Sequence, residues 1–158
     1  MDYKINCFIM MVCVFISYVS FIWIKYGIQK SISMSYYALP DNLKILFTLF
    51  CWGFAFPAII AGVETIPLMF FAGAGICFVG AAAQIKDKWV YKIHMTAAIS
   101  GIIFSQLAIW LGYHMPYVNL ISIGLAILIP FLTKKYYFWW IELVAFSAIC
   151  YTIGTSVL

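Results

Sequence analysis

Long apolar segments alternate with short polar connections along the whole chain. A helix of about 20 apolar residues crosses the roughly 30 Å hydrocarbon core of a bilayer. Such a helix also satisfies its own main-chain hydrogen bonds, which lipid cannot do. The pattern predicts an all-α fold, a polytopic membrane domain over residues 1–158 in which a bundle of six transmembrane helices is joined by short loops. The predicted spans lie at about 5–24, 45–63, 66–85, 93–112, 117–132 and 136–155.

The third and fourth segments are the centre of this prediction because each carries a stripe of small or polar residues at helical spacing. Small residues let helix backbones approach closely in lipid. The connection over residues 86–92 is short, so the two helices should be antiparallel neighbours with their stripes in contact. The third segment carries Gly73, Cys77, Gly80, Ala81 and Gln84, and the fourth carries His94, Ala97, Ala98, Gly101, Ser105, Ala108 and Gly112.

The composition agrees with a chain that is surrounded by lipid. The sequence is 66% hydrophobic and only 9% charged, whereas soluble domains carry roughly 25% charged residues. Trp and Tyr gather near segment ends, which suits the headgroup region of a bilayer. The first segment is longer than the apolar core of about 7–15 residues in a signal peptide, and no small-x-small cleavage site follows it. We therefore interpret it as a retained helix.

The lysines predict an orientation. Six spans place connections one, three and five on one side of the membrane, and the positive-inside rule makes their lysine-rich side cytoplasmic. Both termini would then lie outside, where Lys4 is found. The chain has no arginine, which argues against bidentate phosphate recognition and a nucleic-acid partner. The lysines of the three connections are Lys25, Lys30, Lys44, Lys86, Lys88, Lys92, Lys134 and Lys135.

Connection one, residues 25–44, is the longest polar stretch and is rich in serine and tyrosine. We interpret it as a loop at the level of the headgroups. Pro40 and Asp41 predict a helix start, with the Asp41 carboxylate as the N-cap. The alternative role for Asp41 is a ligand-binding carboxylate. Glu64, in the next connection, is interpreted as a solvated turn residue.

Glu142 is the most informative single residue because it lies inside the sixth apolar segment. An ionised carboxylate at the centre of a bilayer costs roughly 2.5 kcal/mol or more, so such groups normally face the bundle interior with a partner. Two interpretations follow. Either Glu142 belongs to a functional site, or it reaches the headgroups or pairs with Lys134.

Counting the crossings places five polar residues near the lysine-rich side, where they could surround one pocket. Glu142, His94 and Asp87 are the candidates for catalysis, and Gln84, His94, Glu142 and Asp41 are the candidates for ligand binding. For His94 the alternative is a packed imidazole that is hydrogen-bonded to the main chain.

Metal and cofactor sites are not expected. The five cysteines fall inside apolar segments without a CxxC pair, which argues against both a zinc site and a disulfide framework. His114 would lie about 30 Å from His94 along a straight helix, so the two imidazoles cannot share one metal. No phosphate-binding glycine loop is present, and no GxSxG sequence accompanies the serines.

Two stretches resemble a known family when they are taken together. One is SISMSYY at Ser31–Tyr37 followed by LFTLFCWGFAFP at Leu46–Pro57, and the other is LMFFAGAGICFVGAAAQIK at Leu68–Lys86 followed by VYKIH at Val90–His94. They resemble small uncharacterised multi-span membrane proteins of Bacteroides-type bacteria and their phages. This resemblance implies a membrane protein and supplies no activity.

A fainter resemblance, to the DRAM/Sfk class of six-span proteins, is carried by Ile32-Ser33 in the first connection. Met34 stands where that class has an acidic residue. The resemblance implies that this loop lies outside the cytosol, whereas the lysine distribution favours the opposite orientation, which we adopt.

Three functional hypotheses remain after these arguments. The first is a non-enzymatic protein that binds membrane lipids or a small solute, or that assembles as a homo-oligomer or with another membrane protein. The second is a lipid-acting enzyme that uses Glu142 and His94. The third, a small transporter, ranks last because neither an inverted repeat nor a charged mid-membrane pathway is evident.

Overall fold

The computed structural model describes residues 3–64, 66–83 and 87–158, and every regular element in these ranges is helical. The all-α prediction is therefore confirmed. Two short elements, α2 (Ser35–Ala38) and η1 (Asp41–Leu43), lie within connection one. The longer elements are α1 (Tyr3–Tyr26), α3 (Ile45–Gly62), α4 (Leu68–Ala81), α5 (Lys88–Leu107), its π-helical continuation η2 (Ala108–Gly112), α6 (Pro116–Leu132) and α7 (Tyr137–Val157).

Four helical stretches of the described chain are long and apolar enough to cross a membrane, namely Tyr3–Tyr26, Asp41–Gly62, Lys88–Gly112 and Tyr137–Val157. The helices α4 and α6 are apolar but shorter. We expected the third segment to be helical over 66–85, yet α4 ends at Ala81, and at a rise of 1.5 Å per residue it is about 21 Å long. Ala82 leaves the helical conformation, with φ −95° and ψ 42°.

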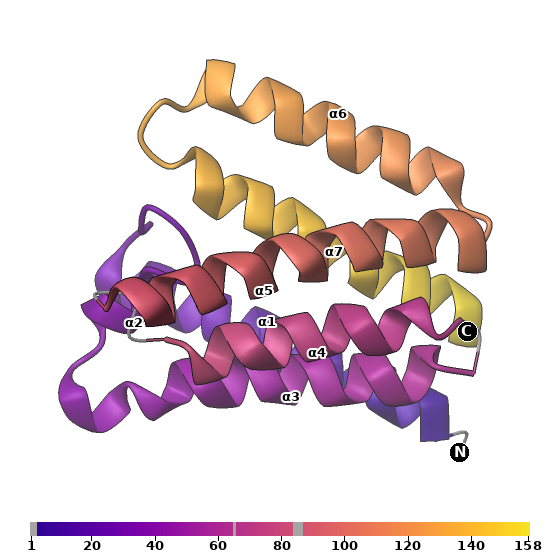
Figure 1. Ribbon diagram of the computed structural model, residues 1–158, viewed down its shortest axis with the longest axis horizontal. Coiled ribbons are helices and arrows are strands. Elements are labelled where there is room, and N and C mark those ends of the chain that lie inside the picture. The colour runs from indigo at the N-terminus through magenta and orange to yellow at the C-terminus, as the bar shows by residue number, and fades with distance from the viewer. Residues whose placement is uncertain (1–2, 65, 84–86) are drawn as a thin grey trace.

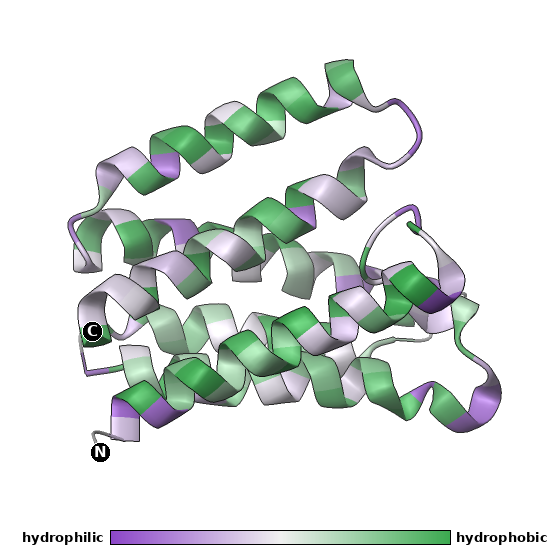
Figure 2. Ribbon diagram, turned by 180° about the vertical axis from the view of Figure 1, so that it is seen from behind, coloured by the Kyte–Doolittle hydropathy of each residue, from purple (hydrophilic) through white to green (hydrophobic). Residues whose placement is uncertain are grey.

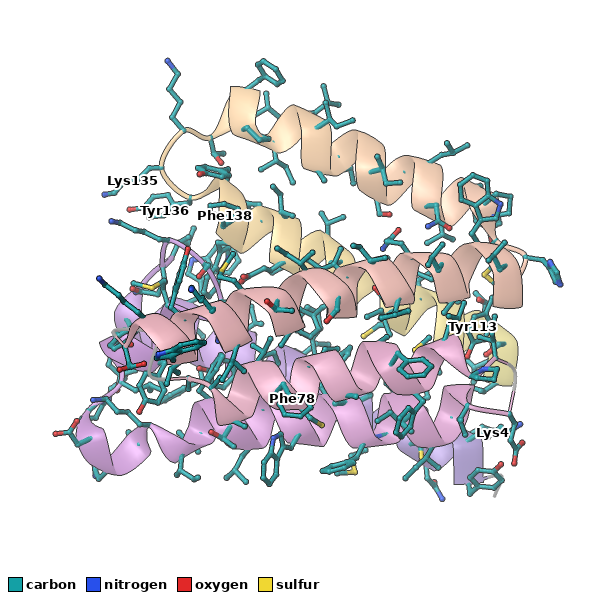
Figure 3. The ribbon with its side chains drawn as sticks, in the orientation of Figure 1. Lys4, Phe78, Tyr113, Lys135, Tyr136 and Phe138 are labelled. Carbon is teal, nitrogen blue, oxygen red and sulfur yellow. The ribbon has the colours of Figure 1, made fainter. Side chains whose placement is uncertain are left out.

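The helices run up and down beside one another. The helix α3 packs between α1 and α4, α4 packs against α5, and α7 packs against α1 and α6. Both termini lie at one end of the bundle, while α2 and the connection between α6 and α7 lie at the other (Figure 1). Figure 3 shows Lys4 and Tyr113 at the terminal end and Lys135 and Tyr136 at the opposite end.

The outer surface is apolar and several polar side chains are inside. Ile24 is 86% exposed and Phe131 is 80% exposed, whereas Ser35 and Thr152 are fully buried. Hydrophobic residues dominate the helices, and the connections are the most hydrophilic parts (Figure 2). Exposed apolar surface of this extent would drive aggregation in water. A surface of this kind is compatible with a membrane protein.

The core is aromatic where α1, α3 and α7 meet. Tyr18 stacks on Phe50 with ring centroids 4.4 Å apart, and Phe54 meets Phe146 edge-on at 4.7 Å. Phe15 also stacks on Phe146 at 5.5 Å. Such ring pairs contribute about 0.5–1.5 kcal/mol each beyond the area that they bury. This cluster fixes α7 against α1 and α3.

The stripe of small residues on α4 does not face α5 as expected. Gly80 packs against Cys51 of α3, whose Thr48 and Trp52 donate hydrogen bonds to the carbonyls of Gly80 and Cys77 at 3.0 and 3.1 Å. The prediction that this stripe contacts the fourth segment is wrong. The cause is that α4 lies between two helices and needs small residues on both sides.

Gly75, on the other side of α4, makes the close approach to α5. A Cβ atom at Gly75 would lie 2.8 Å from the Gly101 Cα atom and 2.8 Å from the Ala97 carbonyl oxygen. A Cβ atom at Gly101 would have its nearest neighbour at 3.5 Å. Gly101 is therefore part of the contact, as expected, but Gly75 is the residue that controls the helix spacing.

We predict that Gly75→Ala destabilises the protein by about 1–3 kcal/mol, because the new methyl group meets the main chain of α5, which cannot turn aside. Gly124→Ala is the matched control, since a Cβ atom there meets nothing within 4 Å. Thermal unfolding of both variants in the same detergent measures the difference. Equal unfolding temperatures for the two variants would contradict the proposed contact.

At the terminal end, Glu64 ties the α3–α4 turn to the start of α1. Its carboxylate lies 2.7 Å from Lys4 Nζ and accepts a hydrogen bond of 2.8 Å from the Tyr3 hydroxyl. The Lys4 ammonium, followed by the Tyr3 hydroxyl, holds the pKa of Glu64 below its ordinary value of 4.5. Glu64 is therefore a paired residue, although it is 61% exposed.

The lowered pKa of Glu64 predicts a pH dependence of stability. The contribution of the pair is complete above pH 4.5, the ordinary pKa, and is lost as the pH falls through the lower pKa of the folded state. Glu64→Gln should therefore unfold at a lower temperature than the wild type at neutral pH, and this gap should close on acidification. A gap that is independent of pH would rule out the ion pair as its cause.

Candidate functional site

Connection one folds into the end of the bundle instead of lying on its surface. Its side chains Ile32, Ser35, Tyr36 and Leu39 are all buried. The turn is built by local hydrogen bonds, since Ser31 Oγ accepts from the Met34 N–H at 3.0 Å and the Ser35 N–H donates to the Ile32 carbonyl at 3.1 Å. Connection one is therefore a packed part of the bundle, with several side chains inside the protein.

A buried hydroxyl pair fixes the turn to α1. Ser35 Oγ donates to the Ile32 carbonyl, so the Tyr18 hydroxyl must supply the proton in its 2.6 Å hydrogen bond with Ser35 Oγ. Every hydroxyl proton in this chain of hydrogen bonds thus has an acceptor. That arrangement lets two polar side chains be buried next to the aromatic core at low cost.

Glu142 fixes the same turn to α7. The Ile32 N–H donates to Glu142 Oε2 at 2.5 Å, and the Ser33 N–H also interacts with the carboxylate. The ion pairs recorded for the described residues are those of Lys4 with Glu64 and Lys44 with Asp41. The partner of Glu142 is therefore main chain and not Lys134, and the headgroup interpretation also fails because the carboxylate points into the bundle.

A pocket of about 70 Å³ lies beside Glu142 in the bundle interior. Residues 32 and 33 of the turn in connection one, which we call the inserted turn, line it together with α3, α4, α5 and α7. The lining is almost entirely apolar. A water molecule needs only about 10–15 Å³ by this measure, so the space admits something larger. Its walls are Ile32, Ser33, Phe47, Phe50, Cys51, Ile76, Val79, Ala97, Ala98, Gly101, Ile102, Ser105, Glu142, Ala145, Phe146 and Ile149.

His94 is buried and engaged with the end of α4. Its Nδ1–H donates to the Ala82 carbonyl at 3.0 Å, and the imidazole also interacts with the Val79 carbonyl. The last carbonyls of a helix have no intrahelical donor, so a side chain that supplies one stabilises the helix end. The imidazole is not part of the pocket wall.

Asp87 and Asp41 have separate local roles. Asp87 is the N-cap of α5 and accepts from the N–H groups of Trp89 at 2.8 Å and Val90 at 3.1 Å.

Asp41 is not an N-cap, and that prediction is wrong. The element η1 begins at Asp41, and the Asp41 carboxylate pairs with Lys44 Nζ at 2.5 Å. The short 3-10 turn moves the start of the long helix to Ile45, beyond the reach of the Asp41 side chain.

The candidate residues therefore do not converge on one pocket. Glu142, His94, Asp87 and Asp41 each interact with a different partner, and Gln84 lies outside the described residues. His114 is in the turn at the terminal end, with φ 53°. No group of three His, Cys, Asp or Glu side chains in the described ranges is placed to hold a metal ion.

A second polar cluster joins α5 to α6. Asn119 Nδ2 donates to the main-chain oxygen and to Oε1 of Gln106 at 2.9 and 2.8 Å, and Ser122 Oγ donates to the same Oε1 at 3.0 Å. The π-helical turn η2 follows directly. Asn119 and Ser122 are three residues apart and therefore share a helix face, whereas nothing in the sequence marks Gln106 as their partner.

No protein-family model, curated protein or solved structure matches this chain. The two resemblances described above therefore stay predictions. The pocket beside Glu142 combines an apolar lining with one acidic residue, and this combination makes it the candidate binding site.

We predict that Glu142→Leu frees the inserted turn, whereas Glu142→Gln retains it because the amide oxygen still accepts the Ile32 N–H. A hydrogen bond to a charged group is worth about 1.5–3 kcal/mol, so amide exchange in peptides that cover residues 30–38 should rise by about ten- to a hundredfold in Glu142→Leu. Hydrogen–deuterium exchange mass spectrometry measures this, with α6 as the internal reference. Unchanged protection in Glu142→Leu would show that the carboxylate does not hold the turn.

Proposed function

We propose that this protein is a non-enzymatic membrane protein that binds a lipid or a small apolar solute in the pocket beside Glu142. The observation that carries the proposal is the pocket itself. Its lining is apolar, it lies between four helices, and it has one carboxylate in its wall. Ligand sites are typically concave and apolar with a few polar groups that orient the ligand.

We further propose that all six long helices cross the bilayer, with the lysine-rich end in the cytoplasm. Both α4 and α6 are short, but each packs along at least one helix of full spanning length. The last turn of α1 contains Lys25, α5 begins at Lys88, and Lys135 lies between α6 and α7. These three segments lie at the same end of the bundle (Figure 1), and the positive-inside rule favours the cytoplasm for that end. The termini would then face outward.

Binding accounts for the site better than catalysis does. General acid–base catalysis requires groups within hydrogen-bonding reach of the same reacting atoms. Glu142 and His94 instead interact with two different stretches of main chain, and only Glu142 borders the pocket. Assembly with a second copy or with another membrane protein would use the apolar outer surface and is compatible with ligand binding inside.

Native mass spectrometry of the protein, purified in mild detergent and exposed to a total lipid extract, tests the proposal. Ala98→Leu adds bulk to a pocket wall, and Ala126→Leu makes the same change on α6, away from the pocket. We expect a bound molecule on the wild type and on Ala126→Leu, and about tenfold weaker binding to Ala98→Leu, equivalent to about 1.4 kcal/mol.

Two results would overturn the proposal. One is a wild type that carries no bound molecule after exposure to the extract. The other is equal binding to Ala98→Leu and Ala126→Leu, which would place the molecule on the outer surface instead of in the pocket.

A further inference from the structure

We infer that the pocket selects a lipophilic amine, whose ammonium group pairs with Glu142 while its hydrocarbon chain lies between α5 and α7. This inference rests on the proposed binding function and specifies the chemistry of the ligand. It follows from the one charged group that borders an otherwise apolar space.

The carboxylate of Glu142 has room for another donor. An ionised carboxylate offers about four acceptor positions. The N–H groups of Ile32 and Ser33 are the donors recorded for it in the described chain. Both belong to the inserted turn, and Ile32, Ser33 and Glu142 all line the pocket. A ligand in the pocket can therefore donate without displacing the turn.

The charge of Glu142 lacks a cationic partner within the described ranges. The recorded ion pairs join Lys4 to Glu64 and Lys44 to Asp41. Main-chain N–H groups contribute only partial positive charge. Removing a carboxylate from water costs several kcal/mol unless a counter-charge and hydrogen bonds compensate it. A protonated amine supplies both, whereas a fatty acid would add a second negative charge and an alcohol would supply no charge.

The remainder of the pocket suits a hydrocarbon chain. On α7 its wall runs from Glu142 through Phe146 to Ile149, which spans about 10 Å at 1.5 Å per residue. On α5 it runs from Ala97 to Ser105, about 12 Å. Ala97, Ala98 and Gly101 are the small residues of the α5 wall. A linear alkyl amine of about eight carbons matches this length.

The lysines at this end of the bundle do not remove the preference of the pocket for an amine. Lys30 and Lys135 are exposed and lie where headgroups and water screen charge over about 8–10 Å. Lys135 also lies 4.9 Å from the centre of the Tyr136 ring, where the aromatic face holds the ammonium at the surface. An amine inside the pocket interacts with the carboxylate in a medium that screens far less.

Binding of n-octylamine, n-octanol and octanoate to the full-length protein in detergent tests the inference, because the three probes share one chain and differ in the headgroup. Isothermal titration calorimetry at neutral pH measures each affinity, and Ala98→Leu gives the background from detergent partitioning. We expect n-octylamine to bind about tenfold more tightly than either other probe. Glu142→Gln should remove this preference, and Glu64→Gln, which neutralises an exposed carboxylate at the other end, should keep it.

The possible results are distinguishable. Equal affinities for the three probes in the wild type, all lost in Ala98→Leu, would overturn the amine inference and leave the pocket as a binding site. A preference that persists in Glu142→Gln would likewise overturn it. The absence of saturable binding for all three probes would count against the proposed function as well. Exchange protection of residues 30–38 in Glu142→Gln verifies that the variant keeps the inserted turn.

Discussion

Lipid offers no hydrogen bonds, so every main-chain polar group that the helices leave unpaired must find its partner inside the protein. This constraint explains where the few polar side chains lie. His94 donates to the end of α4, Asp87 accepts from the start of α5, and Glu142 accepts from the inserted turn. The polar residues at the lysine-rich end thus serve different main-chain termini and do not form one catalytic group.

Glu142 has two roles in this arrangement. Its carboxyl group holds residues 32 and 33 at the end of the bundle, and it places one ionisable side chain beside an apolar pocket. Where hydrocarbon replaces water, a charge of this kind is retained only with compensation. The ammonium group of the amine that we infer would neutralise the negative charge of the Glu142 carboxylate, which the main-chain N–H groups stabilise only in part. Ligand binding and the closure of the bundle would then depend on one carboxylate.

Much of the architecture could be predicted from the sequence, and the errors have physical causes. Apolar length and lysine placement indicate helices and their ends because these depend on local composition. Which helix a given face contacts depends on spatial neighbours, which the sequence does not show. For this reason the sequence does not single out Gly75 as the contact with α5, and the stripe with Gly80 packs against α3 instead of the expected α5. The serine-rich connection gave no sign of insertion, since Ile32 and Ser35 become buried only through contacts with α1 and α7.

We propose that the chain passes through the bilayer six times with connections one, three and five on one face. Single cysteines in a cysteine-free background, reacted with a membrane-impermeant maleimide in sealed vesicles of known orientation, test it most directly. The account predicts that Lys30→Cys, Lys88→Cys and Lys135→Cys react from one side and Glu64→Cys from the other. Reaction of the cysteines at positions 30 and 88 from opposite sides would contradict it.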